Sequence, residues 1–313
     1  MKLLTCIIAC VTFSQFALAQ QEAQFTHYMY NASIINPAYT LDSPGDIKFG
    51  ALHRSQWVGI EGSPTSTMAF GQALLKNKIQ LGVSFINDQV GDFVSENNAY
   101  ADLAYKLALS KHSFLSFGTK LGLRFFDADI NNLNLQSGNS SGTDQAFEDN
   151  IDKQFLNVGA GLFFNTKSFY LGLSAPNLVE TKYFDDSQQS IRDHEQIHGF
   201  LTGGYIFNLS NKVKLKPSFL LKGVQGAPLS VDLNTNLLFN DKLEIGLSYR
   251  LEDAVAGLIG FNFSEKLMLG YSYDYTLSKL SEFNSGSHEI MLIYRVNALR
   301  PDSREHTKSP RFF

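Results

Sequence analysis

The chain has 313 residues, 44% of them hydrophobic, and its 26 basic and 30 acidic side chains give a formal net charge of −4. This slightly acidic balance argues against a nucleic-acid-binding protein, which needs a basic surface. The only cysteines are Cys6 and Cys10, so no disulfide framework or cysteine-ligated metal site is expected beyond the extreme N-terminus.

Residues 1–19 have the pattern of a secretory signal peptide. A positively charged start precedes an apolar stretch over residues 3–18, and an A-x-A cleavage site ends at Ala19. The segment is too short to span a membrane as a helix. Its removal would give a mature chain that starts at Gln20 and has no thiol.

Residues 20–45 precede the first predicted strand and do not alternate. Asn36, Pro37 and Tyr39 belong to a short motif that is predicted to be a turn, because proline fixes φ and asparagine favours turn initiation. If the following strands close into a wide barrel, the side chains of its wall do not fill the lumen. The segment is then either a partial plug that folds inward or an ordered lead-in without a role.

Residues 46–296 alternate with period two and contain no apolar run of helix-spanning length. In residues 243–250, for example, leucine, isoleucine and tyrosine alternate with glutamate, glycine, serine and arginine. This pattern is typical of an outer-membrane barrel, whose strands contact lipid on one face and the lumen on the other. The predicted strands are 46–57, 64–76, 78–88, 94–109, 112–127, 154–166, 168–175, 195–209, 212–223, 228–240, 242–251, 254–264, 266–277 and 287–296.

The chain is therefore predicted to be an all-β protein, a transmembrane antiparallel β-barrel of about 14 strands in the bacterial outer membrane. Its connections alternate between tight and long, and tight turns normally face the periplasm. Both termini are then expected to be periplasmic. Residues 297–313 are expected to form a flexible periplasmic tail, because they are rich in charge and proline.

The predicted tight turns contain many lysines. Lysine is a common solvated turn residue, which explains the enrichment without a function. The alternative is a basic periplasmic ring that docks an acidic partner. The residues concerned are Lys76, Lys78, Lys111, Lys167, Lys212, Lys242 and Lys266.

One catalytic motif occurs in the chain. His194-Glu195-Gln196-Ile197-His198 matches H-E-x-x-H, which binds zinc when both histidines lie on one helix. Here the motif leads into a strand-like, glycine-rich segment, and residues four apart in a strand stand roughly 13 Å apart. We expect no metal site, no cofactor and no enzymatic activity.

Three motifs, in this order, resemble those of the PorP/SprF family of the Bacteroidota type IX secretion system. The first runs from Gln24 to Asn31 and continues through Asn36-Pro37-Ala38-Tyr39. The second is residues 54–64, and the third is residues 271–278 with residues 284–292. The likeness extends from about residue 20 to residue 296. It differs at Thr40-Leu41, where many members have Ala-Gly.

The resemblance implies a non-enzymatic outer-membrane barrel that serves protein secretion and gliding motility. Members of this family act with components of the type IX translocon, or with a secreted adhesin-like surface protein whose C-terminal signal domain they help to the cell surface. The alternation supports the barrel but not the secretion role. A passive channel or a hydrophobic-solute transporter of similar shape is the alternative.

The single tryptophan, Trp57, lies where the first predicted strand leaves the membrane. It is either an interfacial anchor or a binding hot spot, because aromatic residues are enriched in such sites. The first and last strands pair to close a barrel, so two distant segments are expected to form one partner-binding surface. The candidate residues are Trp57, Val58, Gly59, Ile60, Glu61, Asn284, Ser285 and His288.

Overall fold

The computed structural model describes residues 24–41, 45–75, 78–129, 150–179, 181–182, 194–195, 197–225 and 227–297. The predicted signal peptide, the tail after residue 297 and Lys76 lie outside these residues. Two short 3-10 turns, η1 (Tyr28–Asn31) and η3 (Lys279–Glu282), interrupt a chain that is otherwise mostly strand. None of the described helical segments has the length and apolar character needed to cross a membrane.

The strands are β1 (Asp46–Ser55), β2 (Thr65–Leu75), β3 (Ile79–Val90), β4 (Val94–Ala108), β5 (Phe114–Ala128), β6 (Ile151–Asn165), β7 (Phe169–Ala175), β8 (Thr181–Lys182), β9 (His194–Glu195), β10 (His198–Tyr205), β11 (Phe207–Asn208), β12 (Val213–Val224), β13 (Ser230–Phe239), β14 (Leu243–Arg250), β15 (Ala254–Asn262), β16 (Leu267–Thr276) and β17 (Ser287–Asn297). All except β8 and β9 belong to one antiparallel sheet, and these two pair with each other. The longer strands agree with the predicted ones to within a few residues.

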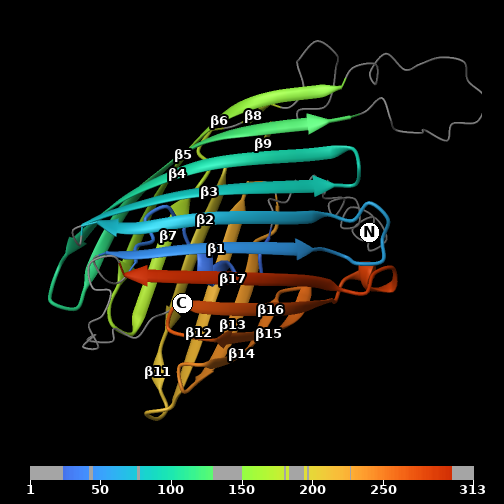
Figure 1. Cartoon of the computed structure of the whole chain (residues 1–313). Helices are drawn as coiled ribbons and strands as arrows, with labels where there is room; N and C mark the ends of the chain where they lie inside the picture. The colour runs from blue at the N-terminus through green and yellow to red at the C-terminus, as the bar shows by residue number, and fades with distance from the viewer. Residues whose placement is uncertain are drawn as a thin grey trace, which may run out of the picture.

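This sheet closes on itself to form a barrel (Figure 1). The first and last strands pair over their whole length, from Asp46 with Asn297 to Ser55 with His288. On the opposite side β10 pairs with both β7 and β12. The two-residue β11 continues β10 in the same register against β12. The wall therefore has fourteen strands, as the sequence predicted.

The side chains of the wall are arranged inside out relative to a soluble protein. In β14, Ile245 and Leu247 are 48% and 61% exposed, whereas Glu244 and Arg250 are 5% and 8% exposed. β16 repeats the pattern, with tyrosines outside and Ser272 and Asp274 inside. An apolar outer face and a polar lumen face are the arrangement that a lipid environment requires.

The connections between strands define two ends of the barrel. The tight-turn end carries the connections 76–78, 109–113, 166–168, 209–212, 240–242 and 263–266, together with the start of β1 and the end of β17. The long-loop end carries the connections 56–64, 129–150, 176–197 and 277–286, together with shorter ones such as 91–93. These two names are used below without reference to the sides of the membrane.

The lumen is filled by the N-terminal segment, residues 24–41, called the plug below. From Phe25 to Leu41 nearly every plug residue is buried, and its apolar side chains join lumen residues of the wall in two clusters. Phe25 packs in one cluster with Leu52 and Met291, and Tyr39 packs in the other with Phe163. Of the two interpretations of this segment, the structure supports the plug.

Candidate functional site

The plug is clamped to the β1–β17 seam by a cluster of buried charges. Glu289 accepts hydrogen bonds from the backbone nitrogens of Thr26 and His27, each at 2.8 Å. Its Oε1 also lies 2.8 Å from His27 Nδ1. Arg54 donates to Asp274 at 2.8 Å, to Thr26 Oγ1 at 3.0 Å and to Glu289 at 3.3 Å. Every carboxylate in this cluster is therefore balanced by donors from the plug and from Arg54.

Three wall lysines bind carbonyl oxygens of the plug backbone. Lys106 Nζ donates to the carbonyl of Leu41 at 2.9 Å, and Lys120 Nζ donates to that of Ser33 at 3.1 Å. Lys48 donates in the same way to Tyr30. Buried backbone carbonyls require such partners, since the irregular plug has no ladder to supply them. The lysines thus donate hydrogen bonds to carbonyl groups of the plug, as the N–H groups of a neighbouring strand do within the sheet.

The predicted Asn36 turn is present and lies in a slot of wall glycines. Tyr39 N donates to the Asn36 carbonyl at 3.1 Å, and Asn36 Nδ2 donates to the carbonyl of Leu162 at 2.9 Å. A Cβ on Gly118 would stand 2.3 Å from Ala38 N, and one on Gly161 would stand 2.2 Å from Asn36 Oδ1. Only glycine permits the turn to approach the wall this closely.

A cavity of about 380 Å³ lies above the plug at the long-loop end. Plug residues Phe25, Tyr28 and Ile35 form part of its floor, and Trp57 lies at its edge. The Tyr28 hydroxyl accepts a hydrogen bond from Asn234 Nδ2 at 2.8 Å. This space is called the vestibule below.

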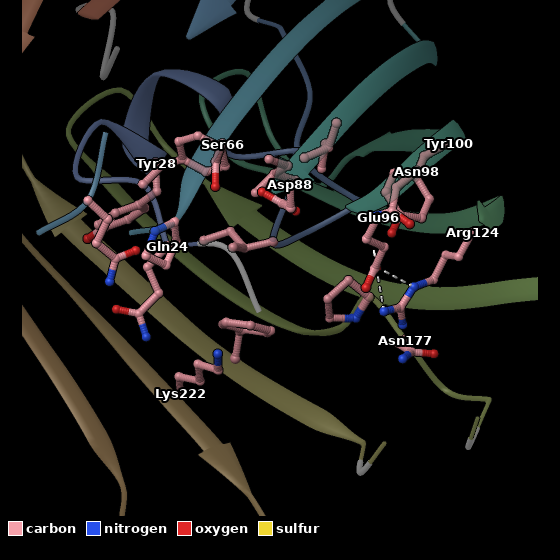
Figure 2. A pocket seen from close by; sticks show the side chains of 18 of the residues that line it. Gln24, Tyr28, Ser66, Asp88, Glu96, Asn98, Tyr100, Arg124, Asn177 and Lys222 are labelled. Carbon is pink, nitrogen blue, oxygen red and sulfur yellow. Dashed lines mark hydrogen bonds and ion pairs between the residues drawn. The ribbon is translucent and has the colours of Figure 1, made fainter. Parts of the chain in front are cut away.

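The polar groups of the vestibule are largely paired with one another. On one side Arg124 Nη2 donates to Glu96 Oε1 at 2.6 Å, and Asn98 Nδ2 donates to the same oxygen at 2.9 Å. Figure 2 shows this group facing Lys222 across the space. Elsewhere in the lining, Arg250 Nε donates to Asp232 Oδ1 at 3.1 Å. The vestibule therefore offers compensated charges above an apolar floor.

The two segments predicted to form one surface do lie together at the long-loop end. Val58 N donates to the Gly286 carbonyl at 2.8 Å, and Ser285 N donates to the Val58 carbonyl at 2.7 Å. Trp57 N donates to Ser287 Oγ at 3.1 Å. These contacts hold Trp57 at a φ of +49°, a left-handed conformation that is rare for a large side chain. Strain of this kind persists only where the surroundings enforce it.

The ordered surface around this junction is called the rim below and comprises residues 56–64 and 277–286. Gly91 N donates to the Gly62 carbonyl at 2.9 Å and so ties the β3–β4 turn to the rim. Val58, Gly59 and Glu61 are exposed on the rim, and Ile60 is half-buried. Asn284 is occupied within the rim, because its Oδ1 accepts hydrogen bonds from Thr276 Oγ1 at 3.2 Å and Gly286 N at 2.7 Å.

His288 differs from the other rim candidates because its side chain lies on the outer wall. Its Nδ1 is 2.7 Å from the hydroxyl of Tyr271, and its ring centroid is 5.2 Å from that of Tyr273. Tyr273 in turn donates to the Ser285 carbonyl at 3.0 Å. His288 therefore supports the rim from below rather than forming part of its upper surface.

Sequence reasoning missed the most exposed aromatic side chain of the rim. Phe283 is 69% exposed, and Leu280 and Leu277 beside it in sequence are also exposed. Leu280 and Phe283 lie between the two halves of the third sequence motif, beyond the predicted strand, and Leu277 is the last residue of that strand. The presence of a phenylalanine in an otherwise polar connection could have indicated that Phe283 belongs to an exposed binding surface.

The described lysines of the tight turns are all exposed at one end of the barrel, as expected from the topology. They are Lys78, Lys111, Lys167, Lys212, Lys242 and Lys266. Nearby, Lys214 pairs with Asp241 at 2.6 Å. The structure brings these lysines to one end of the barrel, where the exposed Asp241 and Glu265 lie in the same turns. The basic ring and its acidic partner stay a prediction.

The H-E-x-x-H motif is divided between two strands. His194 and Glu195 form β9, and His198 begins β10. The helical geometry that would bring both histidines to one metal is therefore not formed. In the part of the chain that the structure describes, no group of three or more histidine, cysteine or acidic residues has metal-binding geometry.

The described part of the plug runs along the lumen from one end of the barrel to the other. Gln24 lines the vestibule at the long-loop end, whereas Leu41 N donates to Gln80 Oε1 near the tight-turn end. The residues before Gln24 lie outside the described structure, so the expected periplasmic position of the N-terminus stays a prediction. The chain descends through the lumen before β1 begins.

Solved structures that resemble this one are outer-membrane barrels. A FadL homologue of Pseudomonas aeruginosa matches with a TM-score of 0.50 and 9% identity, over 84% of this chain and 92% of that chain. The toluene transporter TodX of P. putida matches with a TM-score of 0.50 and 10% identity, over 85% and 94%. The Ralstonia pickettii toluene transporter TbuX gives 0.50 and 9%, over 85% and 93%. At these identities the likeness shows the fold alone.

Comparison with curated proteins gave no match. A family model described as "Type IX secretion system membrane protein PorP/SprF" matches residues 17–294, which include the plug, the rim and nearly the whole wall. The fold and the three sequence motifs agree with this assignment. The chain is an outer-membrane β-barrel that belongs to the PorP/SprF family of type IX secretion system membrane proteins.

Proposed function

We propose that this protein is a non-enzymatic barrel whose rim binds a secreted surface protein, helping its C-terminal signal domain reach or stay on the cell surface. The observation that carries the proposal is the strained loop at Trp57. One hydrogen bond from Trp57 N and two at the Val58 backbone pin this loop to residues 285–287. A preorganised loop binds at a lower entropic cost than a flexible one. In this proposal the long-loop end faces outside and the tight turns face the periplasm.

Exposed apolar side chains make the rim suitable for a protein partner. Phe283 and Val58 flank the pinned loop, and Leu280 extends the surface. Aromatic anchors on a rigid support dominate the affinity of many interfaces. The exposed lysines of the tight turns would serve a separate contact, with acidic components of the translocon in the periplasm.

The plug opposes the alternative of a passive channel or hydrophobic-solute transporter. Its anchors run from Thr26 near the long-loop end to Leu41 near the tight-turn end, and lumen residues beside it, such as Ser116 and Leu74, are fully buried. The likeness to toluene transporters is a likeness of fold, and it does not indicate that this protein binds their substrates. We therefore expect little steady conductance from the purified protein.

The proposal is tested with Trp57→Ala and Phe283→Ala in native cells, by surface detection of the secreted partner and by cross-linking pull-down. Hot-spot truncation costs about 2 kcal/mol or more, so partner capture should fall by roughly 30-fold or more. Leu229→Ala is a matched control, because Leu229 is 56% exposed near the long-loop end but lies outside the rim. Normal display with both rim variants, in barrels that assemble normally, would refute the proposal.

A further inference from the structure

The rim presents an exposed apolar patch that no described part of the chain covers. Its side chains are those of Phe283, Leu280 and Val58. Backbone hydrogen bonds join these positions, because Phe283 N donates to the Leu280 carbonyl at 3.1 Å and Ser285 N donates to the Val58 carbonyl at 2.7 Å. An ordered apolar patch on an exposed connection is typical of a protein interface. The charges around the patch then indicate what kind of segment binds there.

The patch is surrounded by carboxylates. Glu61 and Glu282 are exposed on the rim itself. Asp92 is exposed in the β3–β4 turn, which a hydrogen bond ties to the rim, and Glu252 is exposed in the β14–β15 turn. The second turn is tied to the rim as well, because Leu277 N donates to one of its carbonyls at 2.7 Å. The four acidic side chains therefore belong to one connected surface.

These four carboxylates are not neutralised within the described structure. None of them forms an ion pair there, whereas the neighbouring Asp253 is paired with Arg250. In the rim and the two turns tied to it, Lys279 is the one exposed cationic side chain. The exposed lysines of the tight turns lie a strand length away, at the opposite end of the barrel, whereas charges act over only about 8 Å at physiological ionic strength. The surface around the patch is thus negatively charged.

An apolar centre with a charged border is the usual arrangement of a protein interface. Exposed border charges contribute little affinity one by one, but together they decide which partners approach. A complementary potential raises the association rate by roughly 10- to 1,000-fold, and a potential of the same sign as the partner opposes its approach. The border of this patch therefore favours a cationic partner over a neutral or an anionic one.

We infer that the segment of the secreted protein that binds the rim is basic. It places an apolar side chain against Phe283 and directs lysine or arginine side chains toward the four surrounding carboxylates. The inference deepens the proposed function and rests on it for the source of the segment. A neutral or acidic segment would leave the carboxylates without a counter-charge.

The test uses the full-length protein in dodecyl maltoside micelles, which are uncharged, with Trp57, the single tryptophan of the chain, as the reporter. The probe is the capped peptide acetyl-lysyl-leucyl-phenylalanyl-leucyl-lysinamide, compared with the same peptide with glutamine or glutamate in place of lysine. We expect a saturable change in Trp57 emission with the basic peptide and binding of the other two that is about tenfold weaker or more. Raising the ionic strength from about 0.01 M to about 1 M, which shortens the Debye length from about 30 Å to about 3 Å, should slow association of the basic peptide and change its dissociation little.

Variants separate the border charges from the apolar anchor. Glu61→Lys combined with Glu282→Lys should slow association of the basic peptide by about tenfold or more at low salt. Phe283→Ala should instead speed its dissociation, as truncation of an anchor usually does. Glu265→Lys is the matched control, because Glu265 is exposed in a tight turn at the other end of the barrel, and it should leave both rates unchanged. A variant that merely distorts the rim would not give a loss that salt and association rate share.

Three results would overturn the inference: no saturation by the basic peptide, equal binding of the three peptides, or an association rate that ionic strength does not change. Display assays keep the two proposals separate. If Phe283→Ala abolishes display and the double reversal at Glu61 and Glu282 leaves it intact, the rim function stands and the inference of a basic segment fails. Selective binding of the basic peptide, together with normal display by Phe283→Ala, would give the reverse.

Discussion

Glu289 is the wall residue whose loss should most directly release the plug. Its carboxylate is fully buried and is contacted by Thr26 N, His27 N, His27 Nδ1 and Arg54. In Glu289→Ala these donors and the Arg54 charge lose their partner. Removing one member of a buried ion pair costs about 3–5 kcal/mol. The backbone hydrogen bonds between β1 and β17 hold the wall together without the Glu289 side chain. We therefore expect most of the lost free energy to weaken the docking of the plug.

A loss of that size would raise the undocked fraction of the plug by roughly 10²- to 10⁴-fold. The assay is single-channel recording of the full-length variant in planar bilayers, with hydrogen exchange at the Thr26 and His27 amides as the second measurement. We expect frequent channel openings and faster exchange. Thr26→Val changes only the plug and should have a smaller effect of the same kind, since it loses its hydrogen bonds to Asp274 and Arg54.

The matched control is Asp232→Asn, which weakens another buried ion pair of the lumen, the one with Arg250. Because Asp232 makes its hydrogen bond within the wall, this variant should keep the conductance and exchange of the parent. If Glu289→Ala kept the conductance and hydrogen exchange of the parent, as Asp232→Asn should, the charge cluster at the β1–β17 seam would not be what holds the plug.

Three further outcomes are expected. Gly118→Val should displace the plug and lower the melting temperature of the barrel, because its Cβ would stand 2.3 Å from Ala38 N. Gly257→Val is the control and should leave the melting temperature unchanged, because nothing lies within 4 Å of its Cβ. Equal melting temperatures of the two variants would contradict this prediction. In Gln24→Cys, made in a chain with Cys6 and Cys10 replaced by serine, the introduced cysteine should react with an impermeant maleimide on intact cells. Lys111→Cys in the same background should react only after permeabilisation, and the opposite pattern would invert the proposed orientation. Reversing three tight-turn lysines to glutamate should weaken capture of periplasmic components, and unchanged capture would discard the basic ring.

The wall was predictable because its signal is local. Whether Glu244 faces the lumen depends on its immediate neighbours in β14, and the alternation there was read correctly. The pairing of the rim segments was also accessible, since a closed barrel must join its first and last strands. Alternation alone predicts that Lys120 and Asp102 face a polar lumen, and a polar lumen wall would be hydrated if nothing filled the barrel. Instead they are buried, and Lys120 binds the plug.

The contacts of the plug were not predictable in the same way. Thr26 and Glu289 are 263 positions apart, and no periodicity connects them. Gly118 and Gly161 looked like small residues on the lumen face of strands, and nothing local showed that they shape a slot for Asn36.

The plug clamp and the rim share the same two strands, and this arrangement couples them. Arg54 lies three residues before Trp57 on the chain, and Glu289 follows Ser287, which binds Trp57 N. A displacement of either strand end at the long-loop end would therefore disturb both the strained loop and the carboxylate that holds the plug. Occupancy of the rim and docking of the plug are then linked equilibria, so a partner that binds the docked form better must also stabilise the plug. With that partner bound, Glu289→Ala should open less often than without it, and opening unaffected by the partner would show that the two sites are independent.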